Sequence, residues 1–175
     1  EYLIRAFAQV VKKSPTARLV IIGKGPEEEN LKSLTKKLKL EIDQQVFFFG
    51  SVGPGILPKI YASCDVVVSP SITIPETGEK EGQGTVVLEA RASGTPAIAS
   101  RSGGLVDTID GKTNGLLFEE RDYKELARLI NYLFSNEQAR KKFSQNGLRH
   151  VREKYSWKVT SSRFMRLYES LVQKH

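Results

Sequence analysis

The chain has 175 residues, of which 39% are hydrophobic and 27% are charged. This length suits one domain with a well-formed core and excludes two large domains. Its 27 lysine and arginine residues exceed the 20 acidic ones, so the formal net charge is +7. A basic balance favours phosphate-bearing partners, although a lysine-rich surface alone explains it equally well. Because the lysines do not alternate with aromatic residues, we expect no nucleic-acid partner.

The single cysteine, Cys64, excludes an internal disulfide and fits a reducing compartment such as the cytoplasm. No run of residues is long and apolar enough to cross a bilayer. The chain opens directly in a helical pattern, with Leu3, Phe7, Val10 and Val11 on one face. We therefore expect it to be a fragment of a longer protein.

Helices and strands are predicted to alternate along the chain. In chain order we expect a helix over 2–12, a strand over 18–23, a helix starting at Pro26, a strand over 45–50, a helix over 54–62 and a strand over 65–69. A long loop over 70–83 precedes a helix over 84–93, a strand over 96–100, a short helical turn within 103–109 and a strand over 114–118. Three helices follow, from Asp122 to about Phe134, over 136–153 and over 157–173.

This alternation predicts an α/β fold, a Rossmann-like parallel sheet with helices on both faces. In such folds a central first strand normally precedes the first helix. Nothing precedes Glu1 here, so we expect the sheet either to lack its first strand or to receive it from another chain or domain.

The turn Gly23-Lys24-Gly25 invites comparison with dinucleotide-binding loops. The third glycine of that pattern is Glu28, whose charge would repel a pyrophosphate. The sequence therefore disfavours a nicotinamide-dependent oxidoreductase. A plain structural turn and a nucleotide-contacting loop both stay open for these residues.

No metal-binding motif is visible. The two histidines, His150 and His175, lie near the C-terminus and do not have metal-ligand spacing with the distant Cys64. We expect no metal and no cofactor. A Gly-x-Ser-x-Gly motif for acyl transfer is also absent.

The most informative segment runs from Ser69 to Gly104 and holds two glutamates, Glu81 and Glu89. Their spacing alone is a weak signal. Glu89 follows the core-like Val86 and Val87, so we expect a buried carboxylate that needs donors such as a cis-diol. The glycine-rich turn before it opens a helix, and helix N-termini at the carboxyl edge of a parallel sheet bind phosphates.

The block Glu81–Ala90, followed by Gly94-Thr95-Pro96 and Gly103-Gly104, resembles the nucleotide-binding half of retaining GT-B glycosyltransferases. The closest similarity is to glycosyltransferase family four, with its pair of glutamates separated by seven residues. The resemblance covers nearly the whole chain. It implies a cytoplasmic donor-binding domain, in solution or at the cytoplasmic face of the membrane. The enzyme would move a hexose from a nucleotide diphosphate sugar to a glycan, lipid or other acceptor, without a metal.

The resemblance also implies roles for individual residues. Glu81 would be the catalytic residue at the donor sugar, and Glu89 would accept hydrogen bonds from the ribose hydroxyls. Backbone N–H groups would hold the sugar hydroxyls and the diphosphate; these belong to Gly82, Gln83, Gly84, Thr85 and Val86. Two turns would lie beside the base and the ribose; they consist of Gly23, Lys24 and Gly25, and of Gly50, Ser51 and Val52.

The chain departs from the family pattern at several places. The arginine and lysine that clamp the diphosphate would precede Glu1, and an N-terminal acceptor domain would also be missing, so we expect the isolated chain to be inactive. Arg91 stands where methionine is usual, near the pocket or on the helix surface. The acidic stretch 76–81 resembles, weakly, enzymes of polysaccharide biosynthesis. We expect the helix within 157–175 to pack toward the missing domain rather than at a membrane.

A second interpretation belongs to a different functional class. The same fold and residues would also suit a non-catalytic module that binds nucleotide sugars or assists assembly. The intact pair of Glu81 and Glu89 favours the enzyme over this alternative.

Overall fold

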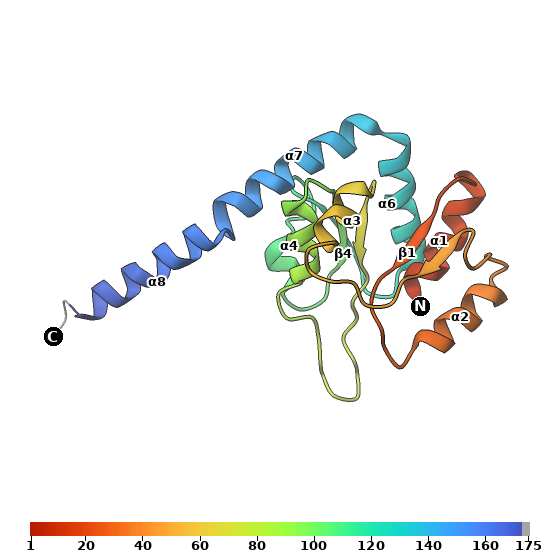
Figure 1. Cartoon of the computed structure of the whole chain (residues 1–175), viewed down its shortest axis with the longest axis horizontal. Coiled ribbons are helices and arrows are strands. Elements are labelled where there is room, and N and C mark those ends of the chain that lie inside the picture. The colour runs from red at the N-terminus through yellow and green to blue at the C-terminus, as the bar shows by residue number, and fades with distance from the viewer. Residues whose placement is uncertain (173–175) are drawn as a thin grey trace.

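The computed structural model describes residues 1–172, and Figure 1 shows their arrangement. The helices are α1 (Tyr2–Lys13), α2 (Glu28–Lys37), α3 (Leu57–Ser63), α4 (Thr85–Ala92), α5 (Leu105–Thr108), α6 (Tyr123–Ser135), α7 (Glu137–Lys154) and α8 (Trp157–Val172). The strands are β1 (Leu19–Ile21), β2 (Val46–Phe48), β3 (Val67–Ser69), β4 (Ala97–Ser100) and β5 (Leu116–Phe118). Residues 173–175, the end of the predicted last helix and the site of His175, lie outside the described residues.

All strand pairs are parallel, and they form two sheets. In the first, β1 pairs with β2, with Leu19 opposite Val46. In the second, the order is β3-β4-β5, with Ile98 of β4 between Val68 and Leu116. Within residues 1–172 no strand pair joins the two sheets, so β1 and β3 are both edge strands. The expected Rossmann-like α/β architecture is confirmed, with its strands divided between two sheets.

The larger hydrophobic core lies between α1, α6 and the strands. Ile4, Phe7 and Val10 recur at helical spacing on α1 and are buried against α6, where Leu126 and Leu133 are fully buried. Burying an aliphatic or aromatic side chain of this size stabilises a fold by about 1.5–3 kcal/mol. This packing holds the N-terminal helix against the C-terminal half of the chain.

A second cluster fixes α4 against the three-stranded sheet. Val87 of α4 is fully buried with Ala97 and Ala99 of β4 and with Leu105 of α5. All four residues of β4 are buried, as expected for a central parallel strand covered on both faces. The elements that carry the candidate site therefore rest on the most completely buried strand.

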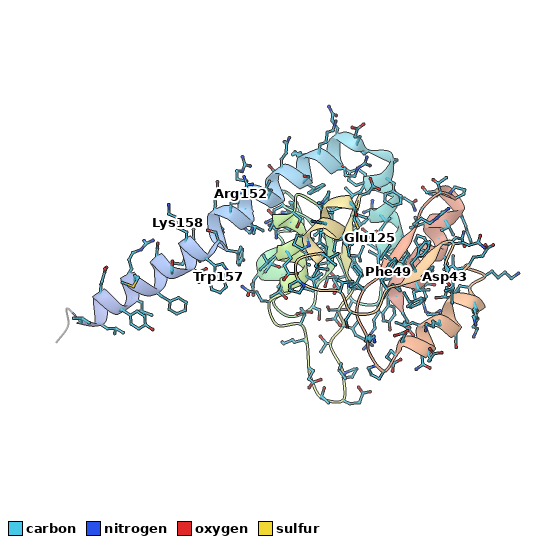
Figure 2. All side chains as sticks on the ribbon, viewed as in Figure 1. Asp43, Phe49, Glu125, Arg152, Trp157 and Lys158 are labelled. Atoms are coloured by element: carbon cyan, nitrogen blue, oxygen red, sulfur yellow. The ribbon has the colours of Figure 1, made fainter. Side chains whose placement is uncertain are left out.

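The last helix, α8, extends away from the body of the molecule (Figure 1). It contains no buried residue, and its first residue, Trp157, is 88% exposed. Figure 2 shows Trp157 and Lys158 at the start of this helix, beyond α7. The apolar side chains of α8 are thus exposed, without a packing partner that buries them among residues 1–172.

Candidate functional site

Glu81 is held in place by hydrogen bonds to both of its carboxylate oxygens. The hydroxyl of Ser71 donates to Oε2 at 3.0 Å, and the N–H of Gly84 donates to Oε1 at 3.3 Å. The backbone is held too, because the N–H of Gly104 donates to the Glu81 carbonyl at 3.1 Å. Ser71 follows β3 and Gly104 follows β4, so this half-buried carboxylate lies at the carboxyl ends of two parallel strands.

Close backbone contact explains the glycines around Glu81. A Cβ atom on Gly103 would collide with the carbonyl oxygen of Glu81, and one on Gly104 would collide with that of Gly82. Gly84, at φ +70°, is the N-cap of α4, where a Cβ would collide with the Leu105 side chain. These glycines let the loop before α4 lie directly on the loop after β4.

Glu89 lies on the exposed side of α4, so the expectation of a buried carboxylate was wrong. Val87 and Ala90 face the core, whereas Val86 is 43% exposed. With 3.6 residues per turn, residues 86 and 89 share one face and residues 87 and 90 share another. Glu89 therefore needs no ligand to offset burial, and solvent or a ligand can reach it.

A phenol from a different helix holds one oxygen of Glu89. The hydroxyl of Tyr61, on α3, donates to Oε2 of Glu89 at 3.2 Å. Burial raises the pKa of Tyr61 to about 12, and the Glu89 carboxylate adds to this rise, so the phenol remains a donor at neutral pH. The sequence contained no local signal for this contact, because Tyr61 lies 28 residues before Glu89.

The N-terminus of α4 lies between the two glutamates and is open to solvent. Gly82, Gln83, Thr85 and Val86 are exposed, and no side chain caps the helix. The first N–H groups of an α-helix have no partner within the helix and carry partial positive charge. This end of α4 therefore presents the kind of donors that an anion requires.

The two turns predicted to contact the nucleoside lie beside each other. The N–H of Gly23 donates to the Gly50 carbonyl at 2.7 Å, and the Lys24 side chain lies over Gly50. Gly25 and Ser51 are exposed and Val52 is half-buried. Both turns follow strands of the smaller sheet, but within residues 1–172 no hydrogen bond links them to the loop of Glu81 or to α4.

Arg91 was predicted to lie near the pocket or on the helix surface, and the surface position was wrong. Its side chain is fully buried on the core-facing side of α4. It donates to the Thr108 carbonyl at 2.6 Å and contacts Nδ1 of His150 at 2.6 Å. A guanidinium can only donate, so Nδ1 is the acceptor. Burial lowers the pKa of Arg91 to about 10, where it is still charged at neutral pH.

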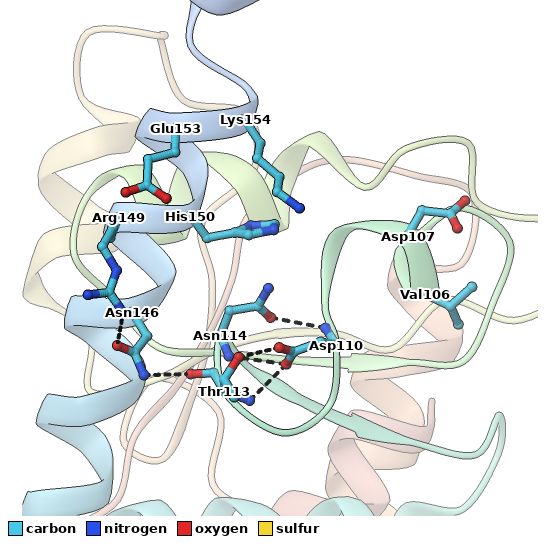
Figure 3. A pocket seen from close by; sticks show the side chains of 10 residues that line it. All are labelled: Val106, Asp107, Asp110, Thr113, Asn114, Asn146, Arg149, His150, Glu153 and Lys154. Atoms are coloured by element: carbon cyan, nitrogen blue, oxygen red, sulfur yellow. Dashed lines mark hydrogen bonds between the residues drawn. The ribbon is translucent and has the colours of Figure 1, made fainter.

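A pocket of about 520 Å³ lies elsewhere, between α7 and the loop before β5 (Figure 3). It is lined by residues such as Asp110, Asn114 and His150, and neither Glu81 nor Glu89 contributes to it. Partial burial opposes the charge of Asp110, but the Thr113 hydroxyl and the N–H groups of residues 112–114 hold its pKa far below the ordinary value. Asp110 thus organises a turn, at the amino end of β5 and away from the glutamates.

The described residues contain neither a metal-binding cluster nor a membrane-spanning helix. Among residues 1–172, histidine, cysteine and acidic side chains nowhere gather in a group of three that could hold a metal ion. None of the described helices combines the length and apolar character needed to cross a membrane. Metal-independent chemistry remains a prediction.

The family model of glycosyl transferases group 1 matches residues 1–150. The chain belongs to this family. It is 32% identical, over 96% of its length, to a GDP-mannose-dependent monoacylated alpha-(1-6)-phosphatidylinositol monomannoside mannosyltransferase of Corynebacterium glutamicum, of which it covers 43%. The chain spans less than half the length of curated relatives that it matches.

Solved structures of glycosyltransferases have the same fold. The chain resembles the C-terminal domain of a glycosyl transferase group 1 family protein of Francisella tularensis with a TM-score of 0.76 and 30% identity, covering 89% of this chain and 78% of that one. It also resembles Anabaena HepE in complex with UDP, with a TM-score of 0.82 and 25% identity, covering 97% of this chain and 44% of that one. The predicted match to the C-terminal half of a GT-B glycosyltransferase is confirmed.

Proposed function

We propose that this chain is the donor-binding half of a retaining glycosyltransferase that moves a hexose from a nucleotide diphosphate sugar to a glycan, lipid or other acceptor. The observation that carries the proposal is that Glu81 lies just before the open N-terminus of α4 and Glu89 lies on the exposed side of the same helix. Family membership supports it, as do a relative named for its use of GDP-mannose and a structural neighbour in complex with UDP.

Glu89 is the proposed ligand of the nucleotide's ribose. Tyr61 occupies one of its oxygens, which leaves the other free to accept hydrogen bonds from a diol. A neutral phenol orients the carboxylate without cancelling its charge, so the carboxylate stays a strong acceptor. The paired turns Gly23–Gly25 and Gly50–Val52 are proposed to lie beside the base and ribose.

Glu81 is the proposed catalytic residue. When the bond to the leaving diphosphate breaks, positive character develops at the anomeric carbon and negative charge grows on the phosphate. A fixed carboxylate near the sugar favours the first change. The backbone N–H groups of Gly82, Gln83, Thr85 and Val86 favour the second, because the Gly84 N–H already donates to Glu81. Such preorganised groups do not have to reorient as the charge develops. We propose that this half of the site needs no metal.

The rest of the protein is proposed to complete both the sheet and the active site. Strand residues on β1 and around β3 are only partly buried, in contrast to β4; they include Leu19, Ile21, Val66 and Val68. A further strand between the sheets would cover them. On α8, exposed apolar residues recur at helical spacing, and we propose that they pack on an acceptor-binding domain; they are Phe164, Leu167, Tyr168 and Leu171. The whole enzyme is proposed to work in the cytoplasm or at the cytoplasmic face of the membrane.

Calorimetry and steady-state kinetics on the full-length protein test the assignment. With the UDP-, GDP- or ADP-sugar that binds the wild type, Glu89→Gln is expected to weaken binding about tenfold, because it removes a charged acceptor. Glu81→Gln is expected to lower kcat more than donor affinity. Glu79→Gln, an exposed acid on the same loop, is the matched control and should change neither.

The outcomes separate the two functional classes. Unchanged donor binding by Glu89→Gln would remove Glu89 from the ribose site. If Glu81→Gln left donor binding and complementation of a null strain intact, the chain would belong to a non-catalytic nucleotide-sugar-binding module instead.

A further inference from the structure

The loop over 70–83 carries Glu81 at its end and extends from the body of the molecule (Figure 1). Its residues 74–80 are all exposed. Loops of this length without regular structure are uncommon in compact domains and are usually functional or disordered. A catalytic carboxylate on such a loop needs anchors, because small displacements of a reacting group reduce the rate steeply.

The carboxylate of Glu120, distant in the sequence, holds this loop by hydrogen bonds. Glu120, just after β5, accepts a hydrogen bond from the Thr73 N–H at 2.8 Å through Oε2 and another from the Thr73 hydroxyl at 2.7 Å through Oε1. The neighbouring Arg121 donates to the Thr73 carbonyl at 3.4 Å. Every polar group of Thr73 is thereby bound to the chain segment that follows β5.

The hydrogen bonds between Thr73 and Glu120 lie close to the contact that holds Glu81. Thr73 lies two residues after Ser71, whose hydroxyl donates to Glu81 and whose carbonyl accepts a hydrogen bond from Ser100 at 2.5 Å. Beyond Thr73, the Ile74 N–H donates to the Glu79 carbonyl at 2.8 Å, which joins the two arms of the loop. Thr73 therefore lies between the contact that orients Glu81 and the turn that closes the loop.

We propose that Glu120 is a positioning residue that fixes the loop of Glu81 in its working conformation by binding Thr73. The inference rests on the proposed catalytic role of Glu81. The hydrogen bond from the Thr73 N–H lowers the pKa of Glu120, so its carboxylate is charged at neutral pH. Hydrogen bonds to an ionised acceptor are about twice as strong as neutral ones, which suits an exposed loop that must be held still.

The test compares three variants of the full-length protein. Glu120→Ala removes both acceptors. Glu120→Gln retains an oxygen for the Thr73 N–H, and its amide can donate to the Thr73 hydroxyl. Glu119→Ala is the matched control, because Glu119 is exposed and pairs with Arg101 rather than with the loop. Cleavage by trypsin after the exposed Lys80 measures loop opening, and kcat and KM for the donor sugar measure positioning.

We expect Glu120→Ala to speed cleavage after Lys80 about tenfold and to lower kcat by about tenfold or more, with KM for the donor changed less than twofold. Glu120→Gln should restore most of both values, and Glu119→Ala should match the wild type. Thermal unfolding of all three variants should stay close to that of the wild type, because the contacts are peripheral.

Two results would overturn the inference. One is a Glu120→Ala variant that is cleaved no faster than Glu119→Ala; the other is faster cleavage with kcat unchanged while Glu81→Gln is impaired. A different result would instead contradict the proposed function, namely a Glu81→Gln enzyme with normal kcat. In that case, faster cleavage of the Glu120→Ala variant would still show that Glu120 holds the loop in place.

Discussion

The hydroxyl of Tyr61 on α3 donates a hydrogen bond to Oε2 of Glu89 on α4, which joins a buried phenol to an exposed carboxylate. Tyr61 is itself held in place, because its carbonyl accepts a hydrogen bond from the buried Thr95 hydroxyl at 2.6 Å. This hydrogen bond fixes the orientation of the Glu89 carboxylate, which the sequence motif does not specify. It also allows the proposed ribose-binding role of Glu89 to be tested without altering Glu89.

Tyr61→Phe should weaken nucleotide binding about fivefold, the effect of losing a hydrogen bond of roughly 1 kcal/mol. The loss should be specific to the ribose. In calorimetry, the preference of the wild type for a nucleotide over its 2′-deoxy form should shrink in the variant. Tyr132→Phe, at a partly exposed tyrosine of α6, is the control. An unaltered preference for the ribose form in Tyr61→Phe would contradict this role.

Gly104→Ala should destabilise the chain by about 1–3 kcal/mol, as expected when an extra methyl group is forced into a packed contact. The added Cβ would meet the Gly82 carbonyl and push the loop of Glu81 away from the loop after β4. Urea unfolding measures the change. Gly55→Ala is the matched control, because nothing lies within 4 Å of its added Cβ. Equal stability of both variants would show that the loops can separate freely.

Stability should fall as the pH drops from about 7.5 toward 5.5, because His150 is held neutral in the folded state. Burial lowers the pKa of His150, and the nearby Arg91 and Lys154 lower it further, against the opposing effect of Asp110 and Glu153. In the unfolded chain a histidine takes up its proton near pH 6.5. Between that value and the lower folded pKa, the unfolded state binds more protons, so acidification favours unfolding.

Urea unfolding at several pH values tests this dependence. His150→Gln keeps an amide oxygen that can accept from Arg91 but cannot be protonated in this range. The variant should lose much of the decline between pH 7.5 and 5.5. If wild type and variant declined in parallel, other groups would be responsible for the effect.

The double variant Phe164→Ser with Leu171→Ser should change the free energy of unfolding of residues 1–172 by no more than about 0.5 kcal/mol relative to the wild type. Both side chains are more than half exposed, so little buried contact is lost. In the full-length protein the same variant should cost about 2–5 kcal/mol if α8 packs on a further domain. Thermal unfolding of both proteins measures the difference. Arg166→Ala, a change in the charged residues of the same helix, serves as the control. Equal small effects in both proteins would exclude α8 from such an interface.

Much of the fold could be predicted from local pattern. The apolar spacing of Phe7 and Val10 specified α1, the β-rich run Val66–Ser69 specified β3, and the glycines around Glu81 marked the turn into α4. These features depend on residues within a few positions of one another, where steric preference and hydrophobic periodicity are decisive. Glu81 and Glu89 could be singled out for the same reason.

The inward face of α4 could not be predicted. Its sequence places apolar residues on several sides, so the pattern allowed Glu89 to be buried and Arg91 to be exposed, whereas the reverse is true. Arg91 is buried because α7 supplies His150, 59 residues away, as its acceptor. Only the packing of α7 on α4 creates that partner.

The sequence by itself therefore determined the order of the elements, the family and the pair of glutamates. The tertiary structure decided how the glutamates are held: Tyr61 contacts Glu89 across 28 positions, and Glu120 contacts Thr73 across 47. Such contacts carry no local signature, because they form only when separate strands and helices pack together. Only the tertiary structure shows that the strands form two sheets and that α8 has no buried residue.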